Sequence, residues 1–315
     1  MGCMAVQFSL ILCVGYGEAS EAMMIVPETF ARDTITREGD AGRQWIDRLP
    51  RIVADLCQQW QLAIDGASMH GYLGVVVPVR RGGEACVLKV SWLDESNADE
   101  ALALTTWNGE GAVRLLAVEP AQGALLLERL DQRRSLHALP VDEALVVAGG
   151  LLRRLAIPAS VRLRPLSTLA VEIAHSLPER WERYGQPMSH ALLNQACDLA
   201  LRHGATTANL LVNYDLHYDN ILAGQREPWL AIDPKVVLGD PEFGIMQLFM
   251  NRLEEIEATG GLDRHFPRLV AAAELDETVA RNWTLVRCVD YWLWGLSVGL
   301  TEDPKRCAAI LQWLG

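Results

Sequence analysis

Apolar residues recur at three- and four-residue steps over Pro27–Leu62, which predicts an amphipathic helical segment. Pro50 interrupts the run, so we expect two helices there rather than one. The apolar period then becomes that of strands. Gly71–Val79 and Ala85–Trp92 are predicted as the two strands of a hairpin, and Arg80–Glu84 supplies the turn between them. A helical segment therefore precedes a small antiparallel sheet.

The pattern beyond this hairpin adds a little more strand and then a long helical region. We expect a helix over Glu95–Trp107 and strands over Gly109–Leu116 and Ala124–Leu130. Helical periods then dominate: they cover Val141–Leu155, the region around Leu169–Leu177, Ser189–Arg202 and nearly everything after Gly244. The polar run DQRRS after Leu130 is predicted to be a hinge. These elements predict an α+β chain with a small lobe at 24–128 and a large, mainly helical lobe at 129–315.

Residues 1–23 stand apart from this pattern. Phe8–Gly15 is apolar, but it is too short to span a membrane, and no Lys or Arg precedes it as in a signal peptide. Met23 and Met24 then precede a more ordinary start. We interpret residues 1–23 as a leader, either disordered or produced by an over-extended start codon, and exclude them from the fold argument.

Composition and charge narrow the class of protein. The chain has 315 residues, 50% of them hydrophobic, so it is globular with ample material for a core. Its net charge of −12 argues against a general binder of nucleic acid or of anionic membranes, and suits a cationic small-molecule partner. The seven cysteines form no C-x-x-C pair, which indicates a reducing, cytoplasmic setting without a zinc site. Nothing indicates an obligate dimer, so a monomer is expected.

The candidate chemistry gathers in residues 209–244, where short apolar runs end in carboxylates. Leu210–Val212 leads to Asp215, and Trp229–Ile232 ends on Asp233. A carboxylate at the end of a buried strand needs a partner, and a metal ion is the usual one. Asn220 follows with the spacing D-x-x-x-x-N, which is the kinase arrangement of a catalytic Asp and metal-holding side chains. We predict that Asp215 takes the proton of an acceptor hydroxyl and that Asn220 and Asp233 hold Mg²⁺.

A second set of candidates lies in the predicted small lobe. Lys89 stands in the middle of a predicted strand, and two interpretations are open for it: a solvent-facing lysine of an edge strand, or the cation that grips nucleotide phosphates. Glu100, in the helix that follows, is the carboxylate expected to align Lys89. Glu128 lies where the LLLERL strand would enter the hinge and is the third predicted nucleotide-binding residue. The turn before the hairpin lacks the kinase pattern G-x-G-x-x-G.

Four segments together resemble the aminoglycoside/hydroxyurea antibiotic resistance kinase family, whose best-known members are streptomycin 6-kinases. They are WNGEGAVRLL (Trp107–Leu116), NYDLHYDNIL, AIDP and GDPEFG, and the first is distinctive of this family rather than of kinases in general. The similarity runs from about Pro27 to the C-terminal helices. The chain departs from the family in having Asn213 and Tyr214 where many members carry His-Gly before the catalytic Asp.

The resemblance implies a two-lobed protein-kinase-like fold and ATP-dependent phosphorylation of a hydroxyl on a small molecule, with an aminoglycoside such as streptomycin as the leading acceptor. It implies that Asp215 matches the catalytic aspartate, that Asn220 and Asp233 match the metal ligands, and that ATP and Mg²⁺ are the cofactors. The alternatives are a kinase of an unrelated metabolite or sugar, and a non-catalytic nucleotide-binding pseudokinase. The complete set of Lys89 and these three residues argues against the pseudokinase.

Carboxylates in the helical C-terminal part are the candidates for receiving a polycationic sugar. The three that we predict are Glu242, Glu254 and Asp290. The alternative for Glu254 is that it forms part of a solvated helix face together with Glu255. We expect a polar, cationic small molecule as the partner, and neither nucleic acid nor a membrane.

Overall fold

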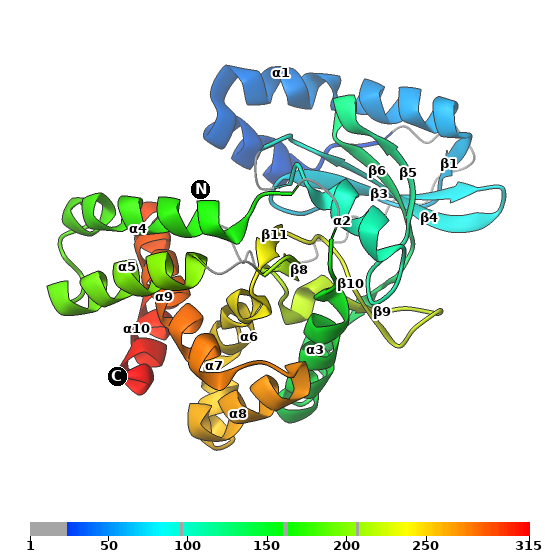
Figure 1. Cartoon of the computed structure of the whole chain (residues 1–315). Coiled ribbons are helices and arrows are strands. Elements are labelled where there is room, and N and C mark those ends of the chain that lie inside the picture. The colour runs from blue at the N-terminus through cyan, green and yellow to red at the C-terminus, as the bar shows by residue number, and fades with distance from the viewer. Residues whose placement is uncertain (1–23, 95–96, 160–162, 206–207) are drawn as a thin grey trace. The chain divides into compact units, whose positions relative to one another are not determined.

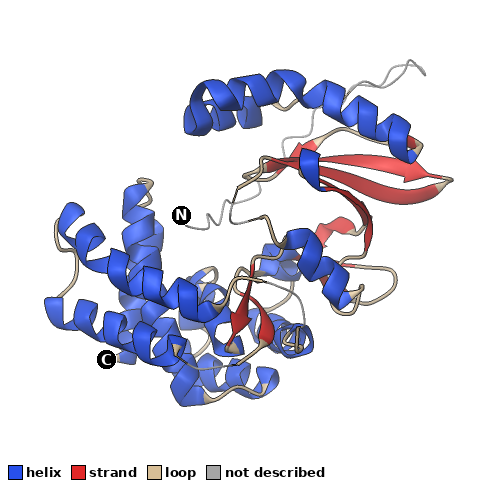
Figure 2. Ribbon diagram, turned by 45° about the horizontal axis from the view of Figure 1, so that its top comes forward, coloured by secondary structure: helices blue, strands red, loops and turns tan. Residues whose placement is uncertain are grey.

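The computed structural model describes residues 24–94, 97–159, 163–205 and 208–315, and the chain divides into two compact units (Figures 1 and 2). The small unit contains the described residues up to Gly109 together with Val113–Leu130. The large unit contains Glu110–Ala112 and Asp131–Gly315. The expected boundary after Glu128 lies close to this division, which falls after Leu130. The predicted leader at 1–23 lies outside the described residues.

The small unit is an antiparallel sheet with two helices. Its strands are β1 (Leu62–Ile64), β2 (Met69–His70), β3 (Gly74–Arg81), β4 (Glu84–Ser91), β5 (Leu115–Glu119) and β6 (Ala124–Glu128), and its helices are α1 (Glu28–Trp60) and α2 (Glu100–Trp107). The strand order is β1-β3-β4-β6-β5, with β2 also paired to β3. The predicted hairpin is present as β3 and β4, with Gly82 and Gly83 at its turn.

Helix α1 covers one face of this sheet (Figure 1). Its apolar stripe, including Leu49 and Val53, packs against alternate strand residues such as Val77 in one buried cluster. Two helical segments are present, but the predicted position of the break is wrong: the helix continues through Pro50, and the segments meet in a kink at Gly39, at φ 63° and ψ −137°. Glycine adopts this conformation without the Cβ penalty that other residues meet. Burial on both sides of Pro50 keeps the helix intact despite the lost hydrogen bond.

Helix α2 begins at Glu100, later than the expected Glu95. Asn97 lies before the helix and donates from its side chain to the Trp92 carbonyl at 2.7 Å. This contact ties Asn97 to the residue that follows β4, and Glu100 stands in the first turn of the helix.

The large unit is mainly helical. Its helices are α3 (Val141–Leu155), α4 (Leu166–Arg183), α5 (His190–Gly204), α6 (Met246–Met250), α7 (Leu253–Ala258), α8 (Gly261–Ala273), α9 (Glu277–Ser297) and α10 (Glu302–Leu314). Its strands are β7 (Asp131–Ser135), β8 (Leu210–Asn213), β9 (Ile221–Ala223), β10 (Trp229–Ala231) and β11 (Val236–Gly239). Helix α3 packs on α8, α4 on α5, and α9 on both α5 and α10. The strands form a β10-β9-β7 sheet and a β8-β11 ribbon.

Two short segments of the large unit differ from the prediction. The polar run DQRRS, expected to be a hinge, is strand β7, which pairs with β9 although most of its residues are exposed. Residues Glu110–Ala112 were expected in a small-lobe strand, but they belong to the large unit. There the Ala231 N–H donates to the Gly111 carbonyl at 2.9 Å, and Arg226 donates to the Ala112 carbonyl at 3.0 Å. The segment WNGEGAVRLL therefore contributes residues to both units.

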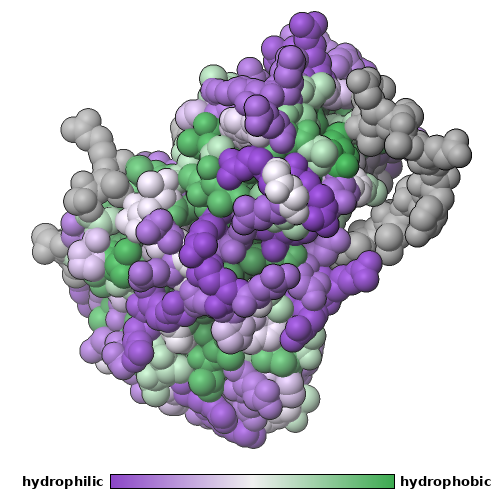
Figure 3. Space-filling view, turned by 90° about the vertical axis from the view of Figure 1, so that its right-hand side faces the viewer, coloured by the Kyte–Doolittle hydropathy of each residue, from purple (hydrophilic) through white to green (hydrophobic). Residues whose placement is uncertain are grey.

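The described surface is polar with dispersed apolar residues. Hydrophilic residues cover most of the face in Figure 3, and hydrophobic ones are interspersed among them. No helix within the described ranges is both long and apolar enough to cross a membrane.

Two neighbouring glycines of α3 provide a matched test of the packing between α3 and α8. A Cβ at Gly149 would lie 2.8 Å from the Ala272 Cβ, whereas a Cβ at Gly150 would meet nothing within 4 Å. We expect Gly149→Ala to lower the free energy of unfolding by about 1–3 kcal/mol through overpacking. Gly150→Ala should raise it by about 0.5–1 kcal/mol, because alanine favours the helix more than glycine does. Urea unfolding measures both, and equal effects of the two changes would contradict the described packing.

Candidate active site

A lysine–glutamate pair forms the candidate site of the small unit. Lys89 lies in the middle of β4, opposite Val76 of β3 and Leu125 of β6, and Glu100 opens α2. The Lys89 Nζ donates to both Glu100 carboxylate oxygens, at 2.7 and 2.6 Å. Side-chain exposure is 12% for Lys89 and 4% for Glu100, so Lys89 is not the solvent-facing lysine of the open alternative.

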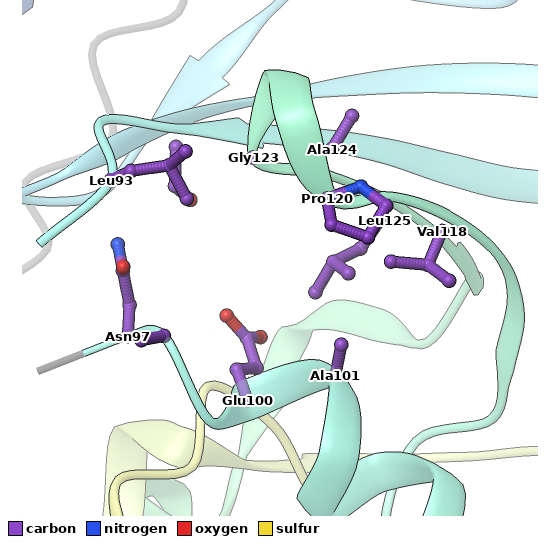
Figure 4. Close-up of a pocket in the computed structure, with 11 residues that line it drawn as sticks. Leu93, Asn97, Glu100, Ala101, Val118, Pro120, Gly123, Ala124 and Leu125 are labelled. Atoms are coloured by element: carbon purple, nitrogen blue, oxygen red, sulfur yellow. The ribbon is translucent and has the colours of Figure 1, made fainter. Parts of the chain in front are cut away.

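A small pocket opens beside this pair, between α2 and the ends of β4 and β6 (Figure 4). The Glu100 carboxyl group points into it from α2. Most of the remaining walls are apolar: they include Leu93, Ala101, Val118, Pro120, Gly123, Ala124 and Leu125. Apolar surroundings lower the local dielectric and strengthen the attraction between an ammonium and a carboxylate. The fold thus fixes the position of the Lys89 charge.

Asp215 and its loop form the candidate site of the large unit. Strand β8 ends at Asn213, whose Oδ1 accepts the Asp215 backbone N–H at 3.1 Å. The Asn220 amide donates from Nδ2 to the Asp215 carbonyl at 3.4 Å. Asp215 and Asn220 are 4% and 3% exposed. Two asparagine side chains therefore hold the Asp215 backbone just beyond the end of β8.

Asp233 is brought beside this loop by the pairing of β9 with β10. Ala231 lies opposite Ile221, and the Ile232 N–H continues the ladder by donating to the Asn220 carbonyl at 2.9 Å. Asp233 follows with a left-handed φ of 49°. Strand β10 ends at Ala231, two residues before Asp233, and the Asp233 side chain is exposed. The register between β9 and β10 nevertheless places Asp233 close to Asn220.

The donor chemistry at this point fits Mg²⁺. Asn220 and Asp233 offer an amide oxygen and a carboxylate, which are hard oxygen ligands, and Mg²⁺ commonly takes one or two protein oxygens with water and phosphate oxygens completing its shell. Across the part of the chain that the structure describes, no group of three or more His, Cys, Asp or Glu could hold a metal ion.

Side chains of the Asp215 loop also contact the helices of the large unit. Tyr218 is fully buried, its hydroxyl donates to the Leu248 carbonyl at 2.8 Å, and burial raises the pKa of its phenol. The Arg252 guanidinium lies 5.1 Å from the Tyr218 ring centroid and donates to the Leu139 carbonyl at 2.9 Å. His217 is 8% exposed, and its carbonyl accepts the Asn220 N–H at 3.0 Å. These contacts make His217 part of the scaffold.

Two further predicted residues lie in backbone-binding positions. Glu128 accepts the Arg114 N–H on Oε1 at 2.8 Å, so its carboxylate joins β6 to the chain entering β5. Glu242 is 8% exposed, and its carboxylate accepts the Asp276 N–H at 3.0 Å. Burial raises the pKa of Glu242. Both side chains have a local structural role.

Glu254 and Asp290, also predicted for the substrate, form ion pairs within the large unit. Glu254 pairs with Arg306 at 2.7 Å and is 65% exposed. Asp290 accepts from Arg180 at 2.6 Å, and the same guanidinium donates to the Asp290 carbonyl. The structure does not gather Glu242, Glu254 and Asp290 through any described hydrogen bond or ion pair among them.

Sequence reasoning missed Lys235 at this site. Its Nζ lies 3.5 Å from the Asp215 Oδ2, and its carbonyl accepts the Tyr214 N–H at 2.9 Å. The available signal was a lone lysine between Pro234 and the apolar start of β11.

Together, the antiparallel sheet with its buried lysine–glutamate pair and the D-x-x-x-x-N loop define a protein-kinase-like phosphotransferase fold. Solved structures agree. The aminoglycoside phosphotransferase APH(4)-Ia, solved as a thermostable mutant in a ternary complex with AMP-PNP and hygromycin B, superposes with a TM-score of 0.61 at 16% sequence identity. The match covers 83% of this chain and 97% of that one. The predicted α+β, protein-kinase-like fold is confirmed.

The chain belongs to the aminoglycoside/hydroxyurea antibiotic resistance kinase family, whose sequence model matches residues 59–299. It is 36% identical to the hydroxyurea phosphotransferase of Kitasatospora aureofaciens, over 93% of this chain and 86% of that protein. It is also 36% identical to the streptomycin 6-kinase of Streptomyces griseus, over 92% of this chain and 96% of that protein. The resemblance that the sequence motifs indicated is confirmed, and the chain is a small-molecule kinase by family.

Removing one partner of the Lys89–Glu100 pair should cost more stability than removing both. In Lys89→Met the nearly buried Glu100 loses its ammonium partner, and we expect the free energy of unfolding to fall by about 3–5 kcal/mol. Adding Glu100→Leu should restore most of that loss, because no unpaired carboxylate remains. Urea unfolding followed by far-UV circular dichroism measures both variants.

Lys305 supplies the control for this comparison. It pairs with Glu302 at the surface, where the two side chains are 70% and 66% exposed. Lys305→Met should leave the unfolding midpoint nearly unchanged, since exposed pairs contribute little. If Lys89→Met behaves like Lys305→Met, the pair at Lys89 does not have the buried character described above.

Proposed function

We propose that this chain is an ATP-dependent O-phosphotransferase that acts on a hydroxyl of an aminoglycoside such as streptomycin. The observation that carries the proposal is the arrangement of the Asp215–Asn220 loop. Hydrogen bonds hold the Asp215 backbone just beyond β8, and the β9–β10 ladder brings Asn220 beside Asp233. This is the set of oxygen groups that phosphoryl transfer to an alcohol needs.

In the proposed reaction, Asp215 accepts a hydrogen bond from the acceptor hydroxyl and takes its proton. The hydroxyl oxygen forms a bond to the γ-phosphorus of ATP as the bond to the ADP oxygen breaks. Such a reaction depends on alignment and charge stabilisation more than on covalent chemistry by the protein. The rigid attachment of the Asp215 loop supports this role, because the carboxylate is already positioned before the acceptor arrives.

Lys89 and Glu100 are proposed to serve the nucleotide. The Glu100 carboxylate orients the Lys89 ammonium, which would pair with phosphate oxygens of ATP. Glu128 would lie near the nucleotide through its place at the end of β6, while its carboxylate keeps the Arg114 backbone in position. Asn220 and Asp233 would hold Mg²⁺, which supplies positive charge to the phosphate oxygens when it is bound.

The proposed acceptor is polar and cationic. The chain's net charge of −12 favours the approach of a polycation, and the family relationship to a streptomycin 6-kinase supports an aminoglycoside. Glu242, Glu254 and Asp290 remain the proposed acidic contacts. Glu254 and Asp290 would exchange Arg306 and Arg180 for a cationic group of the substrate.

Hydroxyurea is a second candidate acceptor. A hydroxyurea phosphotransferase is as similar to this chain as the streptomycin 6-kinase is, at 36% identity. The two acceptors are separated by an ADP-release assay with streptomycin, other aminoglycosides, hydroxyurea and simple sugars. We expect turnover with at least one aminoglycoside, and a flat response to all of them would overturn the aminoglycoside assignment.

Replacing the proposed base should abolish transfer without disturbing the fold. Asp215→Asn keeps the size of the side chain but removes its negative charge, and we expect kcat to fall by about 10²–10³-fold or more. Asp219→Asn is the matched control, because Asp219 lies on the same loop with 39% of its side chain exposed. The control should keep near wild-type kcat, and retained turnover in Asp215→Asn would remove Asp215 from the mechanism.

Weakening the proposed metal site should appear in the dependence on Mg²⁺. Asp233→Asn exchanges a charged ligand for a neutral one, and we expect the Mg²⁺ concentration for half-maximal activity to rise by about 10–100-fold. The exposed Asp198, on α5, provides an Asn control that should leave this concentration unchanged. An unchanged Mg²⁺ requirement in Asp233→Asn would contradict the proposed ligand.

A further inference from the structure

The pairing of β11 with β8 places Lys235 beside the proposed base, Asp215. Strand β11 pairs with β8 so that Val236 is opposite Asn213. The ladder extends one step further, where the Lys235 carbonyl accepts the Tyr214 N–H at 2.9 Å. Lys235 therefore flanks the residue before Asp215, and its Nζ lies 3.5 Å from the Asp215 Oδ2.

The contact differs from the other buried lysine pair of the chain. Lys89 binds both oxygens of Glu100 at 2.7 and 2.6 Å, which is the range of a short charge-assisted hydrogen bond. The 3.5 Å between Lys235 and Asp215 lies within ion-pair range but beyond the usual N–H···O distance. Lys235 is 15% exposed, so its ammonium is largely sheltered from water beside the Asp215 carboxylate.

Lysine is rare in this chain, which makes the presence of a lysine beside Asp215 informative. The sequence has 28 lysines and arginines together, and the lysines among them are three: Lys89, Lys235 and Lys305. Lysine carries a compact point charge on a flexible stem, whereas arginine presents a planar fork. Lys89 lies beside Glu100, Lys235 lies beside Asp215, and Lys305 is a surface residue.

The Lys235 ammonium is a candidate for stabilising the negative charge of the transition state. Charge spreads over the γ-phosphoryl oxygens in the transition state of phosphoryl transfer, and a fixed cation nearby stabilises it. The loop Asp215–Asn220 itself contains no Lys or Arg. Arg287 reaches the loop, but its guanidinium donates to the Tyr214 carbonyl at 3.2 Å and lies 4.7 Å from the Phe243 ring centroid. Its charge is directed toward the scaffold.

We propose that Lys235 is a catalytic residue that contacts the transferring phosphoryl group, and this inference rests on the proposed function. In the step, the acceptor oxygen binds the γ-phosphorus, the bond to ADP breaks, and the hydroxyl proton passes to Asp215. Lys235 keeps its proton throughout. Before the nucleotide binds, its ammonium offsets the cost of placing the Asp215 carboxylate away from water.

A purely structural role predicts different behaviour. If Lys235 only balanced the charge of Asp215, it would meet ADP and an ATP analogue in the same way. A residue that contacts the γ-phosphoryl group distinguishes the two nucleotides, because ADP lacks that group.

The three lysines permit a direct spectroscopic test on the full chain. Lysine labelled with carbon-13 at Cε should give three side-chain NMR signals, each assigned by a Lys→Met variant. We expect the Lys235 signal to move with AMP-PNP and Mg²⁺ but not with ADP and Mg²⁺. The Lys89 signal should move with both nucleotides, and the exposed Lys305 signal should move with neither. A Lys235 signal that responds equally to both nucleotides, or to neither, would overturn the inference.

Kinetics provide a second readout. Lys235→Met should lower kcat by about 10²–10³-fold while the Kd for ADP stays within about twofold of wild type. Lys235→Arg keeps the positive charge, so its unfolding midpoint should stay close to that of wild type. It should recover only part of kcat, since a planar guanidinium cannot reproduce the point charge of an ammonium. Lys305→Met is the control and should leave kcat unchanged. A Lys235→Met variant with wild-type kcat would refute the role.

The failure of this inference is distinguishable from the failure of the proposed function. If Lys89 responds to nucleotide and the wild-type chain turns over an acceptor while Lys235 stays silent, Lys235 alone is misassigned. If neither lysine responds to any nucleotide, the proposed kinase function has failed, and the role of Lys235 falls with it.

Discussion

The candidate site of the large unit is organised around one carboxylate, that of Asp215, which is 4% exposed. Burial of an unpaired charge is costly, so the surrounding chain has to compensate it. Lys235 brings an ammonium within 3.5 Å of the carboxylate. Asn213 and Asn220 bind the backbone of the loop and hold its course. Strand pairing of β8 with β11 and of β9 with β10 places these groups, so the small β elements of a mainly helical unit carry the site.

The same constraint appears in the small unit with a different solution. Glu100 is as deeply buried as Asp215, and Lys89 binds both of its oxygens at short distance. This pair fixes the position of one cation in the small unit, where we propose that it binds nucleotide phosphates. In the large unit, the Lys235 ammonium lies 3.5 Å from the carboxylate that we propose as the base.

Periodicity and motif spacing predicted much of this organisation. The helix Val141–Leu155 was predicted with the bounds that the structure has, and the D-x-x-x-x-N spacing located Asp215 and Asn220. Pro50 and the DQRRS run were misjudged because tertiary packing and strand pairing overrode local preference. The exposure of Asp233 and the approach of Lys235 depend on where β10 ends and how β11 pairs, which no local pattern reveals.

The destination of the γ-phosphoryl group of ATP tests the central claim most directly. The wild-type chain would be incubated with Mg²⁺ and ATP carrying radioactive phosphorus at the γ-position, with streptomycin or hydroxyurea as the acceptor, and the products separated by chromatography. The account predicts that the label appears in a phosphomonoester of an acceptor, with unlabelled ADP as the other product. Label that stays in ATP, or that appears only as inorganic phosphate with every acceptor, would contradict it.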